Sequence, residues 1–259
     1  MKKKIGIIGY GYVGRAMRRL FETHFEIFLY DIETHPVKQN VEGMDLIVIC
    51  VPTPCSADGS CDTSIVSEVV SWVDAPLILI KSTVPPGTTD ELSKKYNKQL
   101  HFSPEYIGEP SNFVPPWKYP DPVTAAWHSF VIVGGPRASE VLDYFATVMA
   151  TSAHYVSCSN KEAELAKYME NAYFALKVAF CNEFFDIADR FGVDYKKLRE
   201  LWLLDSRIDP DHTLVFRDKR GFGGKCLPKD LSAIVKLAEE NNFDPILLRS
   251  ILLSNEKVR

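Results

Sequence analysis

One ten-residue segment near the end of the chain, Gly221–Asp230 (GFGGKCLPKD), combines residue types that suit covalent chemistry on a carbonyl group. Proline is favoured at the start of a helix, so Pro228 predicts that a helix begins there and that Cys226 lies just outside its N-terminus. The helix dipole, with Lys225 and Lys229 nearby, favours the thiolate form of a cysteine in that position. An activated thiol after a glycine-rich approach is typical of covalent catalysis, and we therefore predict that Cys226 is a nucleophile.

Three further polar residues are candidates for the same site. Asp230 falls early in the predicted helix, where helix capping alone would explain an aspartate. Because it lies beside a candidate nucleophile, a functional role is about as well supported as capping. Lys167 and Asn171 are four positions apart in a helical segment, so they are neighbours on one helix face. Taken singly, such a lysine is usually solvated and such an asparagine is usually incidental.

A glycine pattern at the start of the chain predicts a dinucleotide site. Residues 9–14 read GYGYVG, which fits G-x-G-x-x-G after an apolar run and at the start of a helical segment. Glycines permit the tight turn, and the helix N-terminus presents N–H groups to a pyrophosphate. The next apolar run ends in Asp31, whose carboxylate would accept from the ribose 2′-hydroxyl and repel a 2′-phosphate. We therefore expect NAD rather than NADP, held by Gly9, Gly11, Tyr12, Val13, Gly14 and Asp31.

Three later apolar runs also end in unusual sequences. They are VPTP at 51–54, KSTVPPGT at 81–88 and FSPE at 102–105. In an open α/β sheet the ligand crevice lies at the carboxyl ends of the strands, so these segments are expected to face the same cleft as the glycine pattern. Each one alone is nearly as well explained by an ordinary loop. Their recurrence favours a site.

Hydrophobic periodicity indicates the elements that position these residues. Short β-branched runs alternate with helix-like segments in the first part of the chain. The predicted strands are Lys4–Gly9, Glu26–Asp31, Asp45–Val51, Leu77–Ser82, Gln99–Ser103, Phe130–Val133 and His154–Val156, with a helix at Ser139–Met149. This alternation predicts an α/β fold with a Rossmann-type, doubly wound, mostly parallel sheet.

Beyond Ser157 the pattern is helical for the rest of the chain. A long helix is predicted, with Asn160 as its cap and one face formed by Ala163, Ala166, Ala172, Leu176, Phe180, Phe184 and Ile187. Shorter helices are predicted at Tyr195–Leu204, Pro228–Asn241 and Pro245–Asn255. We therefore predict an NAD-binding domain over residues 1–157 and an all-helical domain over 158–259. The long helix suggests a homodimer, although such a face is as often plain core.

Composition and charge argue against several classes of function. The 259 residues carry a net charge of -4, which provides no basic face for nucleic acid or an anionic membrane. Too few apolar residues follow Lys2–Lys4 for a signal peptide, and no segment has the length of a membrane-spanning helix. We expect a cytoplasmic protein with a small-molecule substrate and with neither nucleic acid nor membrane as a partner.

Apart from Cys226, the cysteines and one proline-rich stretch are interpreted as ordinary structural features. The six cysteines include no CxxC pair and no histidine at ligand spacing, so neither a metal site nor a disulfide framework is expected. Apart from Cys226 they are interpreted as reduced, buried or incidental thiols. The stretch 110–127 is interpreted as a surface loop, with Trp117 and Tyr119 as candidate ligand contacts.

Six groups of motifs occur in the order found in one enzyme family. They are GYGYVG, VPTP, KSTVPPGT, SPEYIGE, AELAKYMENA with FCNE, and GFGGKCLPKD, and they extend over almost the whole chain. In these motifs the sequence resembles the UDP-glucose/GDP-mannose dehydrogenase family, and the last motif is highly specific. The resemblance implies a UDP-glucose 6-dehydrogenase-like activity. In that reaction a sugar primary alcohol becomes a carboxylate through two successive hydride transfers to NAD, with a covalent thioester between them.

Matching positions imply roles for individual residues. Cys226 resembles the nucleophile that traps the aldehyde as a thiohemiacetal. Lys167 and Asn171 resemble the groups that stabilise the developing oxyanion, a role that suits fixed donors in a water-poor site. A simple alcohol dehydrogenase would not need the cysteine, because only the second oxidation requires a covalent hold on the aldehyde.

The same comparison implies roles in proton transfer and binding. Asp230 resembles the residue that handles protons together with Thr83 and a water, and Glu105 resembles the group that helps water attack the thioester. The implied cofactor contacts are Thr53, Thr83, Glu109 and Lys229, and the implied substrate contacts are Lys167, Asn171, Arg207 and Gly223.

The chain also departs from the family pattern. Family members usually continue into a third, nucleotide-binding domain, whereas this sequence stops at Arg259; a separate chain supplying that domain, or a different substrate, is then expected. Gly108 stands where a basic residue is common. Two alternatives stay open: a catalytically silent or partner-dependent NAD-binding protein derived from the family, and a two-electron β-hydroxyacid dehydrogenase. The GFGGKCLPKD segment argues against the second, because such enzymes need no thiol.

Overall fold

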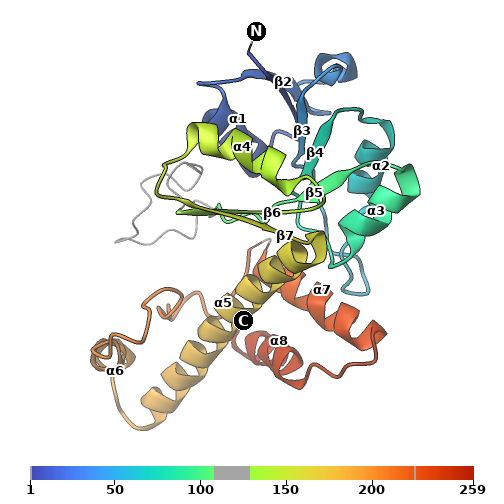
Figure 1. Cartoon of the computed structure of the whole chain (residues 1–259). Helices are drawn as coiled ribbons and strands as arrows, with labels where there is room; N and C mark the ends of the chain where they lie inside the picture. The colour runs from blue at the N-terminus through green and yellow to red at the C-terminus, as the bar shows by residue number, and fades with distance from the viewer. Residues whose placement is uncertain (1, 108–128, 225) are drawn as a thin grey trace. The chain divides into compact units, whose positions relative to one another are not determined.

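The computed structural model describes residues 2–107, 129–224 and 226–259. The chain divides into two compact units, Met1–Pro54 with Asp62–Lys167 and Cys55–Cys61 with Tyr168–Arg259. Most of their helices and strands are labelled in Figure 1. The first unit runs on to Lys167, inside the long helix, and the predicted domain boundary after Ser157 stays a prediction.

The first unit is built on one seven-stranded sheet in the order β2-β1-β3-β4-β5-β6-β7. The strands are β1 (Lys4–Ile8), β2 (Glu26–Tyr30), β3 (Leu46–Ile49), β4 (Leu77–Ile80), β5 (Leu100–Phe102), β6 (Phe130–Gly134) and β7 (His154–Cys158). Neighbouring strands are parallel except for β5 and β6. The predicted Rossmann-type, mostly parallel sheet is therefore confirmed. Its order reverses between β1 and β3, so the topological switch point lies where these two strands end.

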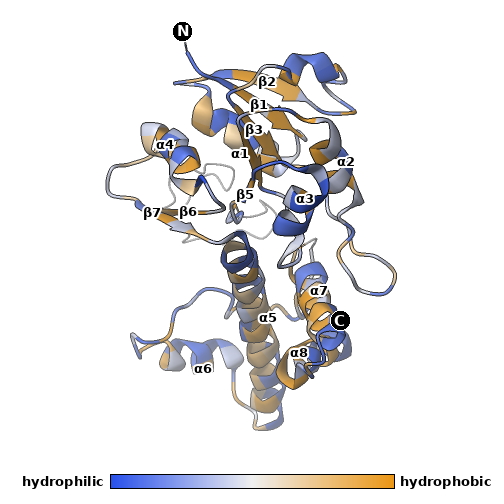
Figure 2. Cartoon of the chain, turned by 45° about the vertical axis from the view of Figure 1, so that its right-hand side comes forward, coloured by the Kyte–Doolittle hydropathy of each residue, from blue (hydrophilic) through white to orange (hydrophobic). Residues whose placement is uncertain are grey.

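Helices cover both faces of this sheet. On one face, α1 (Tyr12–Phe21) and α4 (Ala138–Val148) pack against side chains that include Leu46 and Val48. On the other face, α2 (Ser64–Trp72) and α3 (Thr88–Tyr96) pack against Ile47 and Ile49. Alternate residues of a strand point to opposite faces, so a strand buried on both sides is apolar throughout. β1 and β3 accordingly have the hydrophobic colour in Figure 2. A short 3₁₀ helix, η1 (Lys38–Val41), precedes β3.

The long helix α5 spans Asn160–Arg190, and its N-terminus corrects one prediction. Ser159, not Asn160, is the capping residue: the Ser159 Oγ accepts from the Glu162 N–H at 3.2 Å, and the Glu162 carboxylate accepts from the Ser159 N–H at 2.8 Å. This reciprocal pair is a capping box. Asn160 is buried and joins the helix to β5 instead. Its Oδ1 accepts from the Phe102 N–H at 3.0 Å, and its Nδ2 donates to the Leu100 carbonyl at 3.2 Å.

One turn into α5, the buried side chain of Glu164 caps a different helix. Its carboxylate accepts from the Gly87 N–H at 2.6 Å and from the Thr89 N–H at 2.9 Å, at the N-terminus of α3. Gly87 has φ +99°, which only glycine adopts without strain. Burial raises the pKa of Glu164, and the hydrogen bonds from Thr89 and Gly87 oppose that shift. Glu164 thus fixes the KSTVPPGT loop to α5.

The second unit packs three helices against the rest of α5. Ala172, Ala175 and Ala179 form a core with residues of α7 (Leu227–Glu240) and α8 (Ile246–Val258). Alanines allow these helices to approach closely. Further along α5, Cys181 and Ala188 pack on Tyr195 of α6 (Tyr195–Trp202). The predicted helices at these positions are therefore present, with their ends shifted by a few residues.

The predicted apolar face of α5 is correct only in part. Ala163 and Ala172 are buried, whereas Phe180, Phe184 and Ile187 are 44%, 41% and 39% exposed. The spacing indicated a common face, but within its own unit the helix buries the small residues and leaves these larger ones to solvent.

Candidate active site

The glycine loop lies at the switch point of the sheet, between β1 and α1. A Cβ on Gly9 would lie 2.6 Å from the Cys50 carbonyl oxygen, and one on Gly14 would lie 2.0 Å from the Gly9 carbonyl oxygen. Both positions therefore require glycine. Gly11, at the N-cap of α1, has no atom within 4 Å of where its Cβ would be. Its missing side chain leaves room above a helix N-terminus with no acidic residue in its first turn.

Two residues between these glycines were predicted to touch the cofactor. Tyr12 is 45% exposed, and Val13 packs on the core.

Asp31 follows β2 directly. Its Oδ2 accepts from the Tyr10 N–H at 2.9 Å, and its Oδ1 accepts from the Thr34 N–H at 3.0 Å. Burial opposes the charged form of Asp31, but the hydrogen bonds from Tyr10, Thr34 and Glu33 prevail and lower its pKa. The carboxylate is therefore ionised beside the glycine loop.

The segments after β3 and β4 meet at the same edge. The buried Thr53 hydroxyl donates to the Thr83 carbonyl at 2.8 Å, and the Ser82 hydroxyl donates to the Val51 carbonyl at 2.7 Å. The structure thus brings together the two threonines that sequence comparison had placed near the cofactor.

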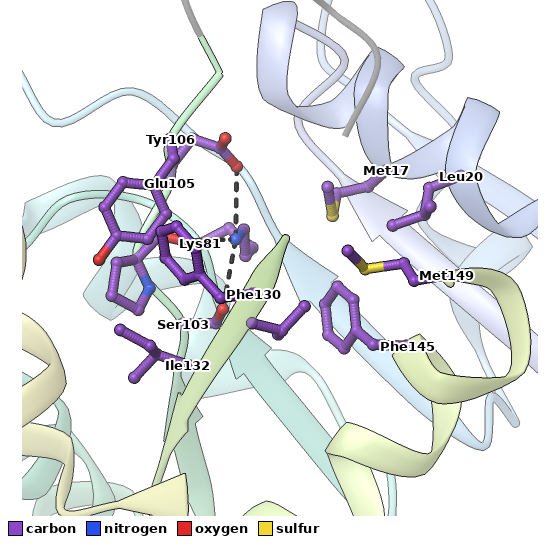
Figure 3. Close-up of a pocket in the computed structure, with 12 residues that line it drawn as sticks. Met17, Leu20, Lys81, Ser103, Glu105, Tyr106, Phe130, Ile132, Phe145 and Met149 are labelled. Atoms are coloured by element: carbon purple, nitrogen blue, oxygen red, sulfur yellow. Dashed lines mark hydrogen bonds and ion pairs between the residues drawn. The ribbon is translucent and has the colours of Figure 1, made fainter. Parts of the chain in front are cut away.

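Glu105 is held by a lysine that the sequence analysis did not single out. Lys81 follows β4 and is 5% exposed. Its Nζ lies 3.4 Å from Glu105 Oε2 and donates to the Pro104 carbonyl at 2.7 Å and to Ser103 Oγ at 3.3 Å. The other carboxylate oxygen, Oε1, accepts from the Ile107 N–H at 2.6 Å. In Figure 3 the Lys81 ammonium lies between Glu105 and Ser103. One sequence feature could have indicated a buried role for Lys81: it directly follows β4, a strand that is apolar at every position.

Replacing Lys81 with methionine is expected to lower the free energy of unfolding by about 3 kcal/mol, because Glu105 then loses its ion pair while it stays largely buried. Urea denaturation measures this change. Lys94→Met on α3 is the matched control, since Lys94 is exposed; it should change stability by less than about 0.5 kcal/mol. Equal effects of the two substitutions would show that the Lys81 ion pair contributes nothing.

Lys167, the last residue of the first unit, is 9% exposed and is not a solvated lysine. Its Nζ lies 4.9 Å from the centre of the Tyr106 ring, the residue after Glu105. The Tyr106 ring in turn makes an edge contact with Phe130, with centroids 4.9 Å apart. A buried ammonium on an aromatic face is positioned by the cation–π attraction.

In the second unit, Cys226 is the N-cap of α7 and is exposed. The sequence analysis predicted Pro228 as the first residue of this helix. The helix begins at Leu227, so Pro228 is its second residue. Proline is tolerated anywhere in the first turn, because no N–H there has a partner within the helix. The thiol therefore lies at the predicted helix N-terminus. Lys225 lies outside the described residues.

The first turn of α7 also carries a buried carboxylate. Asp230 is 2% exposed, and its Oδ2 accepts from Asn171 Nδ2 at 2.5 Å. Lys229 Nζ lies 2.5 Å from Asp230 Oδ1. Asp230 thus binds Asn171 and Lys229, and does not cap its own helix. The structure brings Asn171 of α5 together with Lys229 and Asp230. The last two lie in the first turn of α7, the helix that Cys226 caps.

The glycine-rich approach to Cys226 is held by two asparagines that the sequence analysis did not assign to the site. Asn255 of α8 accepts from the Phe222 N–H at 2.7 Å and donates to the Phe222 carbonyl at 3.0 Å. Asn182 of α5 accepts from the Gly221 N–H at 3.1 Å. A Cβ on Gly223 would lie 3.0 Å from the Arg259 guanidinium. Both asparagines are buried, but nothing in their local sequence indicates their partners.

Of the remaining predicted site residues, Arg207 is described and Glu109 is not. Arg207 is exposed and forms an ion pair with Asp205, with 2.6 Å between Nη2 and Oδ2. Glu109, Gly108 and the stretch 110–127, including Trp117 and Tyr119, lie outside the described residues.

These features fit a bound dinucleotide. Gly11 leaves the space that a pyrophosphate needs above the N-terminus of α1, and the Asp31 carboxylate lies at the end of the neighbouring strand, where a ribose binds. A doubly wound sheet with this loop at its switch point defines a dinucleotide-binding α/β protein of the Rossmann class.

Comparison with family models identifies the family within this class. Residues 34–114 match the NAD binding domain of the UDP-glucose/GDP-mannose dehydrogenase family, and residues 161–257 match its central domain. Together the two matches take in more than half of the chain. The chain belongs to this family, and its cofactor is NAD.

Related sequences and solved structures agree with this family assignment. The UDP-glucose 6-dehydrogenase of Rickettsia prowazekii is 30% identical over 235 residues, which are 86% of this chain and 52% of that protein. The UDP-glucose 6-dehydrogenase of Pseudomonas aeruginosa is 29% identical over 243 residues, 86% of this chain and 51% of that protein. A UDP-glucose dehydrogenase structure from Pyrobaculum islandicum matches with a TM-score of 0.83 and 25% identity, covering 99% of this chain and 68% of that one.

The chain therefore spans about half the length of the curated relatives it matches. Within the described ranges, no helix combines the length and the apolar character needed to cross a bilayer.

Proposed function

We propose that the protein oxidises the primary alcohol of a nucleotide sugar, UDP-glucose or a close analogue, to the carboxylate with NAD. The observation that carries this proposal is the exposed thiol of Cys226 at the N-terminus of α7, the helix whose first turn holds the buried Asp230–Asn171–Lys229 cluster. A two-electron dehydrogenase has no use for such a thiol. A four-electron oxidation needs one to hold the aldehyde.

In this reaction NAD, when bound, is the hydride acceptor for both oxidations, and Cys226 holds the aldehyde. The Cys226 sulfur adds to the aldehyde carbon to form a thiohemiacetal, and later leaves that carbon as a thiolate when the thioester is hydrolysed. The α7 N-terminus stabilises negative charge on this sulfur.

The polar side chains manage protons and charge. Asn171 and Lys167 donate to the substrate oxygen as negative charge develops on it, and the burial of both strengthens that interaction. Asp230, oriented by Asn171, takes the alcohol proton together with Thr83 and a water. Glu105, held by Lys81, orients the water that attacks the thioester.

The remaining predicted contacts are assigned to binding. Thr53, Thr83, Glu109 and Lys229 are proposed to contact NAD, in addition to the glycine loop and Asp31. Arg207 and Gly223 are proposed to contact the nucleotide sugar. We place the reaction in the cytoplasm.

The exposed face of α5 supports a homodimer. Met169, Tyr173, Phe180 and Phe184 are between 41% and 75% exposed and recur every four to seven residues along this helix. Large exposed apolar faces of this kind mark interaction surfaces. Sedimentation equilibrium tests this assignment: a mass equal to one chain at micromolar concentration would contradict it.

The test of the function is to count NADH formed per sugar consumed when the purified protein receives NAD with a panel of UDP- and GDP-sugars. Two NADH per sugar is the expected result and would establish the four-electron reaction. One NADH per sugar would identify a two-electron dehydrogenase instead. No NADH from any sugar, with NAD binding intact, would favour a silent or partner-dependent protein.

A further inference from the structure

A seven-residue hairpin with a cysteine at each end, Cys55–Cys61, lies in the segment between β3 and α2. It is grouped with the second unit, where a Cβ on Gly59 would lie 3.8 Å from the Ser232 side chain of α7. Neither cysteine has a part in the proposed reaction.

The two cysteines face each other across the hairpin as an antiparallel bridge pair. The Ser56 N–H donates to the Ser60 carbonyl at 2.8 Å on one side of the pair, and the Asp62 N–H donates to the Pro54 carbonyl at 2.8 Å on the other. Hydrogen bonds that flank a pair in this way define the non-hydrogen-bonded type, in which opposite Cα atoms approach to about 4.5 Å. That separation lies within the range of about 4.4 to 6.8 Å that a disulfide spans.

The turn of the hairpin is fixed by its own hydrogen bonds. Asp58 Oδ1 accepts from the Ser60 N–H at 3.0 Å and from Ser60 Oγ at 2.7 Å, and the Gly59 N–H donates to the Ser56 carbonyl at 3.0 Å. Gly59 has φ +88°, the left-handed conformation that such a turn needs. The cysteines are therefore already opposite each other in the reduced protein, so little conformational entropy is lost when their sulfurs join.

Cys55 differs in access from the other cysteines outside the proposed site. Cys55 is exposed and Cys61 is half-buried, whereas Cys181 is buried. Burial raises the pKa of Cys50 and of Cys158, which disfavours their reactive thiolate forms.

We propose that Cys55 and Cys61 are a reversible dithiol–disulfide pair that is oxidised by low-molecular-weight disulfides. The Cys55 thiolate attacks one sulfur of the reagent, which breaks the reagent S–S bond and releases one thiol. The Cys61 thiolate then attacks the Cys55 sulfur of the mixed disulfide and releases the second thiol. Two electrons pass from the protein to the reagent, and each released thiolate takes up one of the two protons that the cysteines lose.

The experiment treats the reduced full chain with glutathione disulfide, blocks remaining thiols under denaturing conditions, and measures mass. The expected product has two fewer free thiols than the six of the reduced chain and has lost two hydrogens. Digestion before aspartate cuts at Asp58 and separates the two cysteines. A disulfide between them keeps the two peptides joined until a reductant is added.

The peptide with Cys55 also contains Cys50, so two variants settle which cysteine is linked. Cys50→Ser should still form the linked peptides, and Cys55→Ser should form none and should retain a glutathione adduct on Cys61 or leave it reduced. The proposal is overturned if the wild-type chain carries a stable glutathione adduct on Cys55, or if Cys55 links to Cys226. None of these readouts depends on dehydrogenase activity, so the outcome is independent of the proposed function.

Discussion

Replacing Cys226 with serine is expected to reduce the rate of acid formation by roughly 10³-fold or more, while NAD binding is retained. A serine hydroxyl at this helix N-terminus is a far weaker nucleophile than a thiolate, and its ester would not form at a useful rate. The second oxidation requires the covalent intermediate, so NADH per sugar should fall from two to at most one. The measurements are product analysis by chromatography and NAD titration by calorimetry.

Cys158→Ser on β7 is the matched control for this substitution. Cys158 is a half-buried thiol in the first unit, distant in sequence from the α7 segment, and turnover of this variant should stay within about twofold of the original. Unchanged acid production by Cys226→Ser would refute the assigned role of the cysteine. Loss of NAD binding as well would indicate that the substitution had disturbed the fold.

Replacing Glu164 with alanine is expected to lower the free energy of unfolding by about 3 kcal/mol. The substitution leaves the Gly87 and Thr89 N–H groups without their acceptor in a buried place, and each such donor costs about 1 to 3 kcal/mol. Urea denaturation measures the change. Glu183→Ala, an exposed position on the same helix, should cost less than about 0.5 kcal/mol. Similar losses in both variants would refute the capping role.

The pH dependence of Glu164→Gln tests whether burial or hydrogen bonding dominates the pKa of Glu164. Burial raises the pKa of Glu164 above its ordinary value of 4.5. An acid with a raised pKa in the folded state stabilises the fold fully at pH values below its unfolded pKa, and this contribution is lost as pH rises through the folded pKa. Glutamine does not titrate. The stability of the original chain relative to Glu164→Gln should therefore decrease from acid to neutral pH, and an increase would show instead that the hydrogen bonds from Gly87 and Thr89 outweigh the effect of burial.

The strands, most of the helices and the glycine loop were predictable because they depend on neighbouring residues. β3 and β4 are apolar at every position and stand out as strands buried on both faces. Gly14 is required by a contact with Gly9 in the same loop. The N-terminus of α5 was predicted one residue late, because both Ser159 and Asn160 are good caps; only Ser159 has its capping-box partner Glu162.

The sequence by itself determined the fold class, the cofactor and the residue types of the candidate site, because periodicity, turns and short motifs are local properties. Only the tertiary structure decided which polar groups hold one another. Asn171 and Asp230 are 59 positions apart, Phe222 and Asn255 are 33 apart, and Glu164 and Gly87 are 77 apart. Lys81 meets Glu105 only because β4 and β5 are neighbours in the sheet. Such pairs depend on how distant elements pack, and a buried polar side chain takes the partner that packing brings to it.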